Sequence, residues 1–309
     1  MVVRSLAAAA LGIALLLGSP QQVAESQSGV FRPDPPMKCS SCDEWNAARE
    51  PFRVFGNTSF VGTVGLGAVL ITSADGHILL DGGLPQTAEA IDRGVRALGF
   101  KTADIKLILN SHAHYDHAGG IAAIQRASGA TVASSPSGAK ALERGEPTDE
   151  DPQFAFGRAV NAYPRVPQVR VVADGETLRV GELAIVAHFT PGHTPGSTTW
   201  TWRSCEGERC VNLVYADSLN AVSAPSFRFT DHKERVAAFR KSIATVASLP
   251  CDIILTVHPE TSGLGDKLRR RADKTAVDPF IDPEGCRKYA AAATTTLDTR
   301  LAEEQKEKK

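Results

Sequence analysis

Residues 110–120 read Asn-Ser-His-Ala-His-Tyr-Asp-His-Ala-Gly-Gly, which places three histidines and one aspartate within six consecutive positions, 112–117. Neutral imidazole and carboxylate groups are ligands that divalent zinc accepts, and so dense a polar cluster is costly to bury without a metal. The alternative is a set of ordinary surface or capping residues, in which Asp116 caps the start of a helix. We interpret the stretch as a metal site.

The residues around this stretch indicate where it lies in the fold. Residues 105–109 form a short, mostly apolar run typical of a buried strand, and a helical spacing of apolar residues follows Gly120. The cluster is therefore expected on a loop at the C-terminal end of a strand, where α/β proteins place their sites. Alternation along an extended chain puts His112 and His114 on one side, and the turn into the helix can aim Asp116 and His117 at a second position, so that one loop can serve two metals.

Length and composition are those of an ordinary globular protein. The chain has 309 residues, 42% of them hydrophobic, so it can bury a sizeable core in one large domain or two small ones. The formal net charge is −1, which argues against a nucleic-acid partner. The basic run at residues 269–271 is short and lies beside acidic residues, as on a solvated helix face.

The N-terminus predicts export. Arg4 supplies a positive region, residues 6–17 are apolar, and small residues follow near Ala24 and Ser26. The apolar run is shorter than the roughly 20 residues that span a bilayer, and no cysteine follows it closely enough for a lipid anchor. We expect a signal peptide at residues 1–26, a flexible leader at 27–44 and one domain at 45–309, released into the periplasm without a membrane anchor and acting as a monomer.

Export makes the six cysteines a question of disulfides, and six cysteines allow 15 pairings. Cys205 and Cys210 flank a turn between two strand patterns, so a bridge there would close the tip of a hairpin. A bridge from Cys251 to Cys286 would tie the last helix to the core. The remaining two, Cys39 and Cys42, either pair with each other or stay free, and a metal or redox role for this short Cys-x-x-Cys loop is less favoured because no second cysteine pair or βαβ unit accompanies it.

The order of elements predicts an α+β fold. Strands come first and helices follow, twice over, which indicates two sheets packed face to face with helices outside: an αβ/βα four-layer sandwich with mostly antiparallel sheets. A long loop at residues 145–167 is rich in proline, aspartate and aromatic residues, and such loops are usually functional or disordered. We expect strands at residues 53–55, 60–63, 68–72, 77–81, 105–109, 169–172, 176–180, 183–188, 197–202, 211–215 and 252–257, and helices at 87–98, 121–127, 137–144, 233–248, 264–271 and 284–306.

Two more histidines lie in loops that directly follow predicted strands. His193 lies in the stretch 190–197, in which proline and glycine fix the turn, and His258 precedes Pro259 at the end of another strand pattern. A lone histidine in such a place is more often structural than a ligand. With the cluster at 112–117, however, the two complete a pair of three-residue ligand sets.

The chain at this point resembles the metallo-β-lactamase superfamily, through His112-x-His114-x-Asp116-His117, then His193, then His258. The resemblance narrows to subclass B3 and covers almost the whole mature chain. The stretches that carry it are residues 55–63 (FGNTSFVGT), 200–210 (WTWRSCEGERC), 215–219 (YADSL) and 251–255 (CDIIL).

The resemblance implies two zinc ions. The first would take His112, His114 and His193, and the second Asp116, His117 and His258. Ser218 and Asn220 would lie near the substrate carboxylate or a metal-bound water, and Gln153 of the long loop would line the cleft. Some members pair a leader cysteine with one in the segment matching residues 62–65; Val64 stands there in this chain, which leaves the state of Cys39 and Cys42 open.

The implied activity is hydrolysis of the β-lactam amide of penicillins, cephalosporins and carbapenems, small-molecule substrates attacked by a zinc-bound hydroxide that Asp116 orients. The chain lacks the Ser-x-x-Lys and Lys-Thr-Gly set of serine β-lactamases. One alternative is a thioester, lactone or phosphodiester hydrolase of the same fold, in which an aspartate near Asp217 bridges both metals. Another is a binding protein that has lost catalysis, which the complete ligand set disfavours.

Overall fold

A computed structural model describes residues 1–2, 31–273 and 278–307 of the chain. The chain divides into two units, Met1–Val30 and Phe31–Lys309, and the fold below is that of the second. The expected signal peptide at 1–26 falls outside the described residues apart from the first two. Among the residues described, no helix has both the length and the apolar character needed to cross a membrane.

The first sheet has seven strands, which lie side by side in chain order. Antiparallel pairing joins the first four strands and parallel pairing joins the last four, so this sheet is mixed rather than mostly antiparallel. Its strands are β1 (Phe52–Phe55), β2 (Thr58–Phe60), β3 (Val69–Ser73), β4 (Gly76–Leu80), β5 (Ile105–Leu109), β6 (Thr131–Ser134) and β7 (Arg170–Val171).

The second sheet has five strands in the order β12-β11-β10-β9-β8. Only the β11–β12 pair is parallel, as expected of strands joined by a helical crossover. The strands are β8 (Thr177–Val180), β9 (Leu183–Phe189), β10 (Thr198–Glu206), β11 (Arg209–Ala216) and β12 (Ile253–Thr256).

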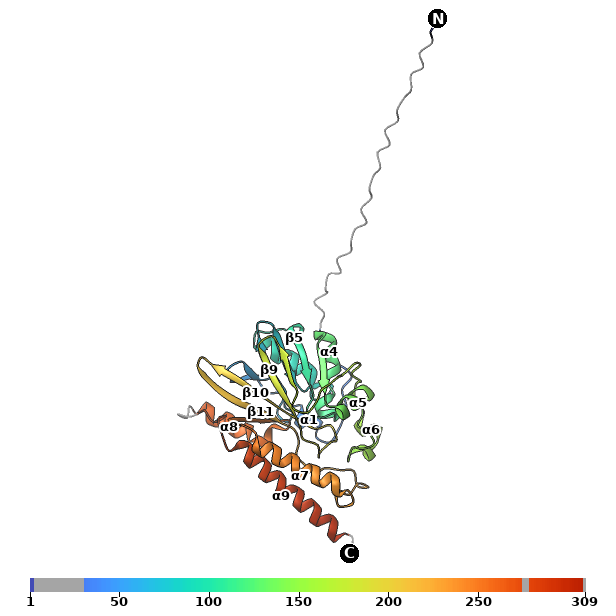
Figure 1. Ribbon diagram of the computed structural model, residues 1–309, viewed down its shortest axis with the longest axis vertical. Helices are drawn as coiled ribbons and strands as arrows, with labels where there is room; N and C mark the ends of the chain where they lie inside the picture. The colour runs from blue at the N-terminus through green and yellow to red at the C-terminus, as the bar shows by residue number, and fades with distance from the viewer. Residues whose placement is uncertain (3–30, 274–277, 308–309) are drawn as a thin grey trace. The chain divides into compact units, whose positions relative to one another are not determined.

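Helices cover the outer face of each sheet, as Figure 1 shows with α4 and α5 on one side and α7 and α9 on the other. The α-helices are α1 (Cys42–Trp45), α2 (Thr87–Ala97), α3 (Tyr115–Ala118), α4 (Ile121–Ser128), α5 (Pro136–Arg144), α6 (Arg158–Asn161), α7 (Lys233–Ser248), α8 (Leu264–Ala272) and α9 (Gly285–Lys306). Short 3₁₀ turns are η1 (Thr102–Asp104), η2 (Phe154–Phe156), η3 (Phe229–Asp231) and η4 (Pro259–Ser262).

Three apolar clusters hold these layers together. The central cluster packs the two sheets face to face and includes Trp200 and Trp202 of the second sheet and Leu80 of the first. A second cluster joins the first sheet to α2, α4 and α5, and a third joins the second sheet to α7 and α9. The predicted αβ/βα four-layer sandwich is thus confirmed: one face of each sheet forms the central core, and the other face packs against helices.

The parallel half of the first sheet positions the histidine loop. Strands β4, β5 and β6 run in the same direction, so their C-terminal ends meet at one edge. Helix α5, which follows β6, starts where Ser135 Oγ accepts a hydrogen bond from Gly138 N and ends at Gly145, whose φ is +77°. The segment 145–167, which was expected to be a long loop, contains the short helices η2 and α6.

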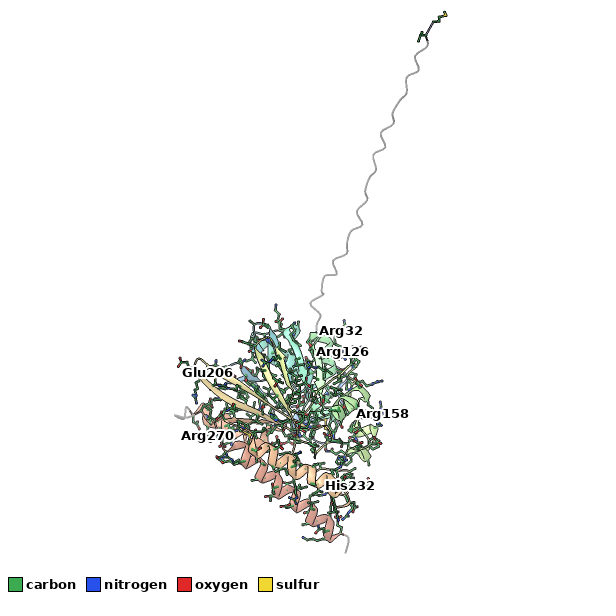
Figure 2. The ribbon with its side chains drawn as sticks, viewed as in Figure 1. Arg32, Arg126, Arg158, Glu206, His232 and Arg270 are labelled. Carbon is green, nitrogen blue, oxygen red and sulfur yellow. A yellow bond between two sulfur atoms is a disulfide. The ribbon has the colours of Figure 1, made fainter. Side chains whose placement is uncertain are left out.

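Residues 31–45 pack on the domain, whereas a flexible leader was expected over 27–44. The Met37 backbone exchanges two hydrogen bonds with the Gln86 side chain, and Cys42 is buried against Leu66 and Leu84. Arg126 of α4 donates to the Arg32 carbonyl and to Asp34, and Figure 2 shows Arg32 beside Arg126. The buried Cys42 and the partly buried Met37 and Trp45 attach this segment to the domain despite its polar composition.

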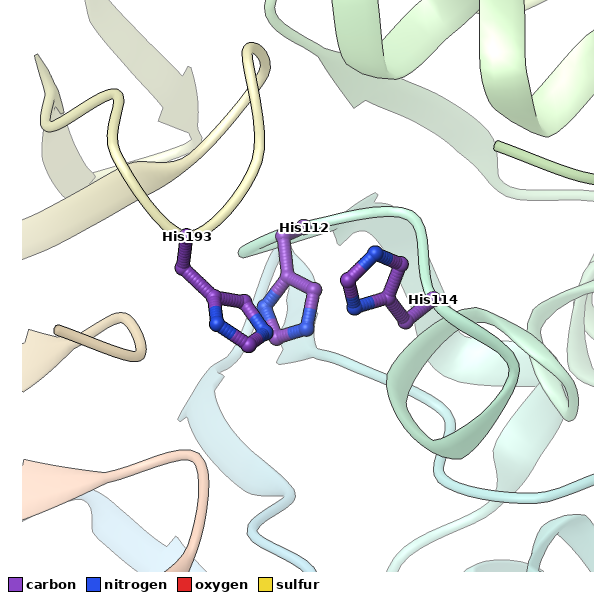
Figure 3. A group of neighbouring side chains, drawn as sticks. All are labelled: His112, His114 and His193. Carbon is purple, nitrogen blue, oxygen red and sulfur yellow. The ribbon is translucent and has the colours of Figure 1, made fainter. Parts of the chain in front are cut away.

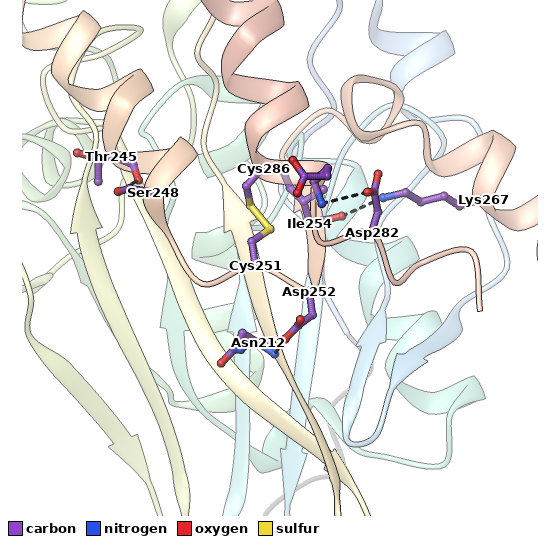
Figure 4. Close-up of a disulfide and its surroundings, with 10 residues drawn as sticks. Asn212, Thr245, Ser248, Cys251, Asp252, Ile254, Lys267, Asp282 and Cys286 are labelled. Carbon is purple, nitrogen blue, oxygen red and sulfur yellow. Dashed lines mark hydrogen bonds between the residues drawn. A yellow bond between two sulfur atoms is a disulfide. The ribbon is translucent and has the colours of Figure 1, made fainter. Parts of the chain in front are cut away.

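Three disulfides are present, and no cysteine among the described residues is free. Cys205 and Cys210 are directly opposite each other on β10 and β11, near the hairpin tip. Cys251 and Cys286 join the residues just before β12 to the first turn of α9 (Figure 4). Cys39 pairs with Cys42, which is one of the two outcomes left open by the sequence.

Candidate metal centre and cleft

One buried carboxylate fixes the start of the histidine loop, the stretch 110–117 that follows β5. Asp81, which follows β4, accepts hydrogen bonds from Ser111 N at 2.8 Å, Ser111 Oγ at 2.6 Å and Asn110 Nδ2 at 3.2 Å. Tyr215 Oη of β11 adds a fourth at 2.9 Å. Asp81 itself has a φ of +59°, which is rare for a residue other than glycine. The start of the loop is therefore fixed to both sheets.

Three histidines meet at one side of this loop. His112 and His114 come from the extended stretch after β5, and His193 comes from the turn between β9 and β10, as Figure 3 shows. One ligand atom from each lies within 4.8 Å of the others. The turn carrying His193 packs so closely on α7 that a Cβ at Gly192 would collide with Phe239, which explains the glycine.

A second set lies next to the first. The Asp116 Oδ2 is 3.2 Å from His117 Nε2 and 3.4 Å from His258 Nε2, and the two histidine nitrogens are 3.3 Å apart. Asp116 and His117 belong to the short helix α3, while His258 follows β12. His112, Asp116 and His117 also present ligand atoms within 4.8 Å of one another, so the two sets adjoin.

Four of the five histidines are oriented by an acceptor behind the ring. His193 Nδ1 donates to the Asn220 carbonyl at 2.7 Å and His258 Nδ1 to the Gly65 carbonyl at 3.1 Å. His112 Nδ1 donates to Asp217 Oδ1 at 2.6 Å. His114 is reversed, because its Nε2 faces the Asp151 carboxylate at 3.1 Å. A carbonyl can only accept, so in His193 and His258 the proton is on Nδ1 and Nε2 is free for a metal.

The donor set fits a divalent cation. Nε2 of His112 is buried and has no hydrogen-bond partner, as expected of an atom that a metal would engage. Burial lowers the pKa of His112 well below its usual value, and burial together with His112 lowers that of His193 to about 3. Burial alone would raise the pKa of Asp116, but His117 and His258 hold it well below its usual value. The lowered pKa values favour a neutral imidazole at His112 and His193 and an ionised carboxylate at Asp116, which are the zinc-binding forms of these groups.

A cleft of about 440 Å³ opens onto both sets. The metal-set residues that line it are His114, Asp116, His193 and His258, and three more lining residues are the expected Gln153, Ser218 and Asn220. No lysine or arginine is among the described residues on its wall. A larger depression, of about 750 Å³, lies beside α7 and holds none of the six candidate ligands.

Some parts of the site lie beyond what the sequence indicated. Trp45 and Tyr289 both line the cleft, and the Trp45 and His258 ring centroids are 5.3 Å apart. Tyr289 Oη donates to the Asp217 carbonyl at 2.8 Å and accepts from Leu219 N at 3.1 Å. These residues come from α1 and α9, at opposite ends of the domain sequence, and carry no local motif.

Comparison with known proteins agrees with this geometry. The model of the metallo-beta-lactamase superfamily matches residues 68–206. The structure of the Rm3 metallo-beta-lactamase is similar at 50% identity and a TM-score of 0.83, covering 87% of this chain and all of that one. MEM-A1, a subclass B3 metallo-beta-lactamase isolated from a soil metagenome library, is 48% identical with a TM-score of 0.82 over 85% of this chain and 99% of that one.

One further relative has a different activity from these metallo-β-lactamases. The hydroxyacylglutathione hydrolase of Anaeromyxobacter dehalogenans (strain 2CP-C) is 31% identical over 192 residues, which are 62% of this chain and 58% of that protein. The B3 enzymes are more similar to this chain and are covered almost completely. Together with the two adjoining sets of candidate metal ligands, these similarities show that the chain belongs to the subclass B3 metallo-β-lactamases, which are hydrolases.

Proposed function

We propose that the protein hydrolyses the β-lactam amide bond of penicillins, cephalosporins and carbapenems with two zinc ions. The observation that supports this proposal is the convergence of six side chains in two adjoining sets at the cleft: His112, His114 and His193 for the first zinc, and Asp116, His117 and His258 for the second. When bound, zinc lowers the pKa of a coordinated water towards neutrality and polarises a carbonyl. The protein's side chains would bind the zinc ions, orient the attacking water and hold the substrate.

Asp116 has two tasks in this proposal. Its carboxylate is buried with a pKa held well below its usual value by His117 and His258, and Oδ2 faces both histidines, so it can bind the second zinc. Because an ionised carboxylate only accepts hydrogen bonds, it can also hold the proton of the attacking water in a fixed direction. That orientation reduces the rearrangement required to reach the transition state.

Neutral donors would receive the substrate carboxylate. Ser218, Asn220 and Thr261 line the cleft and can each donate a hydrogen bond, and no cationic side chain is among the described residues around them. Gln153 contributes a further amide from the opposite loop. Trp45 and Tyr289 supply flat apolar surface for the rest of the substrate.

The test is hydrolysis of a chromogenic cephalosporin and of a carbapenem, with and without a chelator. We expect turnover that the chelator abolishes and zinc restores. His112→Ala should lose the first zinc and His258→Ala the second, each together with turnover. His232→Ala, which removes an exposed histidine outside the cleft, should keep both zinc ions and turnover. Undiminished carbapenem hydrolysis in either ligand variant would refute the assignment.

A thioester hydrolase is the second candidate, favoured by the similarity to hydroxyacylglutathione hydrolase. It requires Asp217 to bridge two metals, yet Asp217 is fully buried, binds His112 Nδ1 and is not among the residues that line the cleft. This arrangement favours the β-lactamase. Chelator-sensitive turnover of a glutathione thioester without turnover of any β-lactam would reverse the order.

We further propose that residues 1–26 are removed on export to the periplasm and that residues 45–309, as one domain, act there as a monomer. The apolar N-terminal stretch and the three disulfides support export. Mass spectrometry of the periplasmic protein should show cleavage near residue 26, and its sedimentation should give the mass of a single chain. A cytoplasmic, uncleaved product would contradict the proposal.

A further inference from the structure

Asp151 lies behind His114, although 37 residues separate the two in the sequence. It comes from the segment between α5 and β7, and only 6% of its surface is exposed. Both carboxylate oxygens face the His114 Nε2, at 3.2 and 3.1 Å. Because an ionised carboxylate only accepts, the His114 ring places its proton on Nε2 and leaves Nδ1 free.

The same carboxylate organises the segment that bears Gln153. Asp151 Oδ1 accepts from Gln153 N at 2.8 Å, and the Asp151 carbonyl accepts from Phe154 N at 3.0 Å. The Asn161 side chain donates to the Gln153 carbonyl at 3.0 Å from farther along the segment. One side chain therefore contacts a metal-set histidine and the turn that carries a residue of the cleft wall.

We propose that Asp151 is a positioning residue, which fixes the His114 ring for the first zinc and joins it to the cleft loop. The inference rests on the proposed function for the identity of the metal. It assigns His114 the opposite ring nitrogen from His112 and His193, which present Nε2 because their Nδ1 atoms are hydrogen-bonded. It also connects the segment of residues 145–169 to the first zinc through His114.

The reversed ring makes His114 dependent on Asp151. Nδ1 is close to the main chain, so aiming it at a metal requires the ring to be held at its far end, and the far end is Nε2. A ring without this acceptor can rotate about its bond to Cβ and turn Nδ1 away. Loss of such a partner typically costs 10–100-fold in metal affinity.

The experiment is a competitive zinc titration of the full mature protein against a chromophoric chelator. Wild-type protein should bind two zinc ions with two dissociation constants. The constant that His193→Ala raises is that of the first zinc, because His193 is a ligand of that zinc only. Asp151→Asn, which keeps the shape but not the charge, should weaken the affinity for the first zinc about 10–100-fold and leave the other unchanged. Asp149→Asn makes the same chemical change at an exposed position of the same loop and should alter neither.

The Asn161→Ala variant distinguishes an effect on the His114 ring from an effect on the order of the loop. It removes the hydrogen bonds to the Gln153 and Phe154 carbonyls but not the one between Asp151 and His114. We expect the zinc affinities to stay as in the wild type while KM for the β-lactam rises. A loss of first-zinc affinity as large as that of Asp151→Asn would overturn the positioning role, because loop order would then be the cause.

Nuclear magnetic resonance of the zinc-loaded wild type gives a readout that needs no variant. The His114 ring should show zinc on Nδ1 and a slowly exchanging, downfield proton on Nε2. Zinc on Nε2, or unchanged affinities in Asp151→Asn, would overturn the inference. Protein that binds two zinc ions but hydrolyses no β-lactam refutes only the proposed function, whereas protein that binds no zinc refutes both.

Discussion

At the scale of single residues, the site consists of ligands that are local in sequence and acceptors that are not. Four of the six candidate ligands fall within residues 112–117, so their spacing alone predicted a metal site. The hydrogen-bond acceptors of the ligand histidines are remote in sequence. Asp217 lies 105 residues from His112, and Gly65 lies 193 residues from His258. A single aspartate or glycine resembles any other in a sequence, and only the fold shows which of them faces a ligand.

Tyr215 tests how firmly the histidine loop is fixed. Its buried hydroxyl donates to Asp81 Oδ2 and contacts the Gly67 carbonyl at 3.0 Å. Tyr215→Phe leaves these acceptors short of a donor and should lower the free energy of unfolding in urea by about 1–2 kcal/mol. Tyr163→Phe is the control, because the Tyr163 hydroxyl is buried without a partner, and it should cost little. Equal losses in the two variants would contradict the role assigned to the Tyr215 hydroxyl.

At the scale of elements, the sequence predicted most helices and strands within one or two residues. Helix α7 begins and ends at the expected residues, 233 and 248. The second strand was misplaced, at 60–63 instead of Thr58–Phe60, because the chain turns back at once: Val61 N donates to the Ala68 carbonyl and Thr63 N to that of Leu66. The parallel pairing of β4 to β7 was not predicted either, because the direction of a strand relative to its neighbours depends on which strands become adjacent in the fold.

The disulfide at the base of α9 closes a longer loop than the one in the hairpin. The sequence separations are 35 residues for Cys251–Cys286 and 5 for Cys205–Cys210. The chain-entropy model gives about 4 kcal/mol for the first and about 2 kcal/mol for the second. Replacing both cysteines of each pair by serine should therefore destabilise the α9 pair more, as measured by chemical denaturation. The reverse order would show that the α9 bridge constrains the unfolded chain less than its length suggests.

The last turns of α9 contain a pH-dependent contact. Glu304 accepts from Phe229 N at 3.1 Å, Thr230 N at 2.8 Å and Arg300 Nε at 2.7 Å. Burial would raise the pKa of Glu304, but the hydrogen bonds from Thr230 and Arg300 hold it below its usual 4.5. A carboxylate with a lowered pKa stabilises the fold above pH 4.5, and this contribution is lost as the pH falls through the folded-state value.

Glu304→Gln should consequently unfold more easily than the wild type at pH 7, by about 1–2 kcal/mol, and the gap should close in acid. Thermal melts at a series of pH values from 7 down to about 3 measure this, a range that spans the usual carboxyl pKa. The neighbouring Glu303→Gln changes an exposed side chain and should show no such gap. A gap that persists unchanged in acid would mean that shape, not charge, is what Glu304 contributes.

At the scale of the whole molecule, the candidate metal centre lies where the two halves of the sandwich meet. The loop after β5 of the first sheet supplies His112, His114, Asp116 and His117, while the ends of strands in the second sheet supply His193 and His258. The sequence, through its family resemblance, predicted that these residues form two sets of three. It did not show that one face of each sheet must pack on the other before either set is complete.

Metal removal should therefore weaken the whole fold and not only the activity. A ligand that binds only the folded state stabilises it by about 2.7 kcal/mol when its free concentration is 100 times its dissociation constant. Chelation should lower the melting temperature, and added zinc should restore it. His258→Ala, which removes one ligand of the second set only, should keep part of the zinc-dependent gain. If metal analysis showed complete removal and the melting temperature did not change, the two sheets would hold the ligands in place without help from the metal, and the site would be preorganised by packing alone.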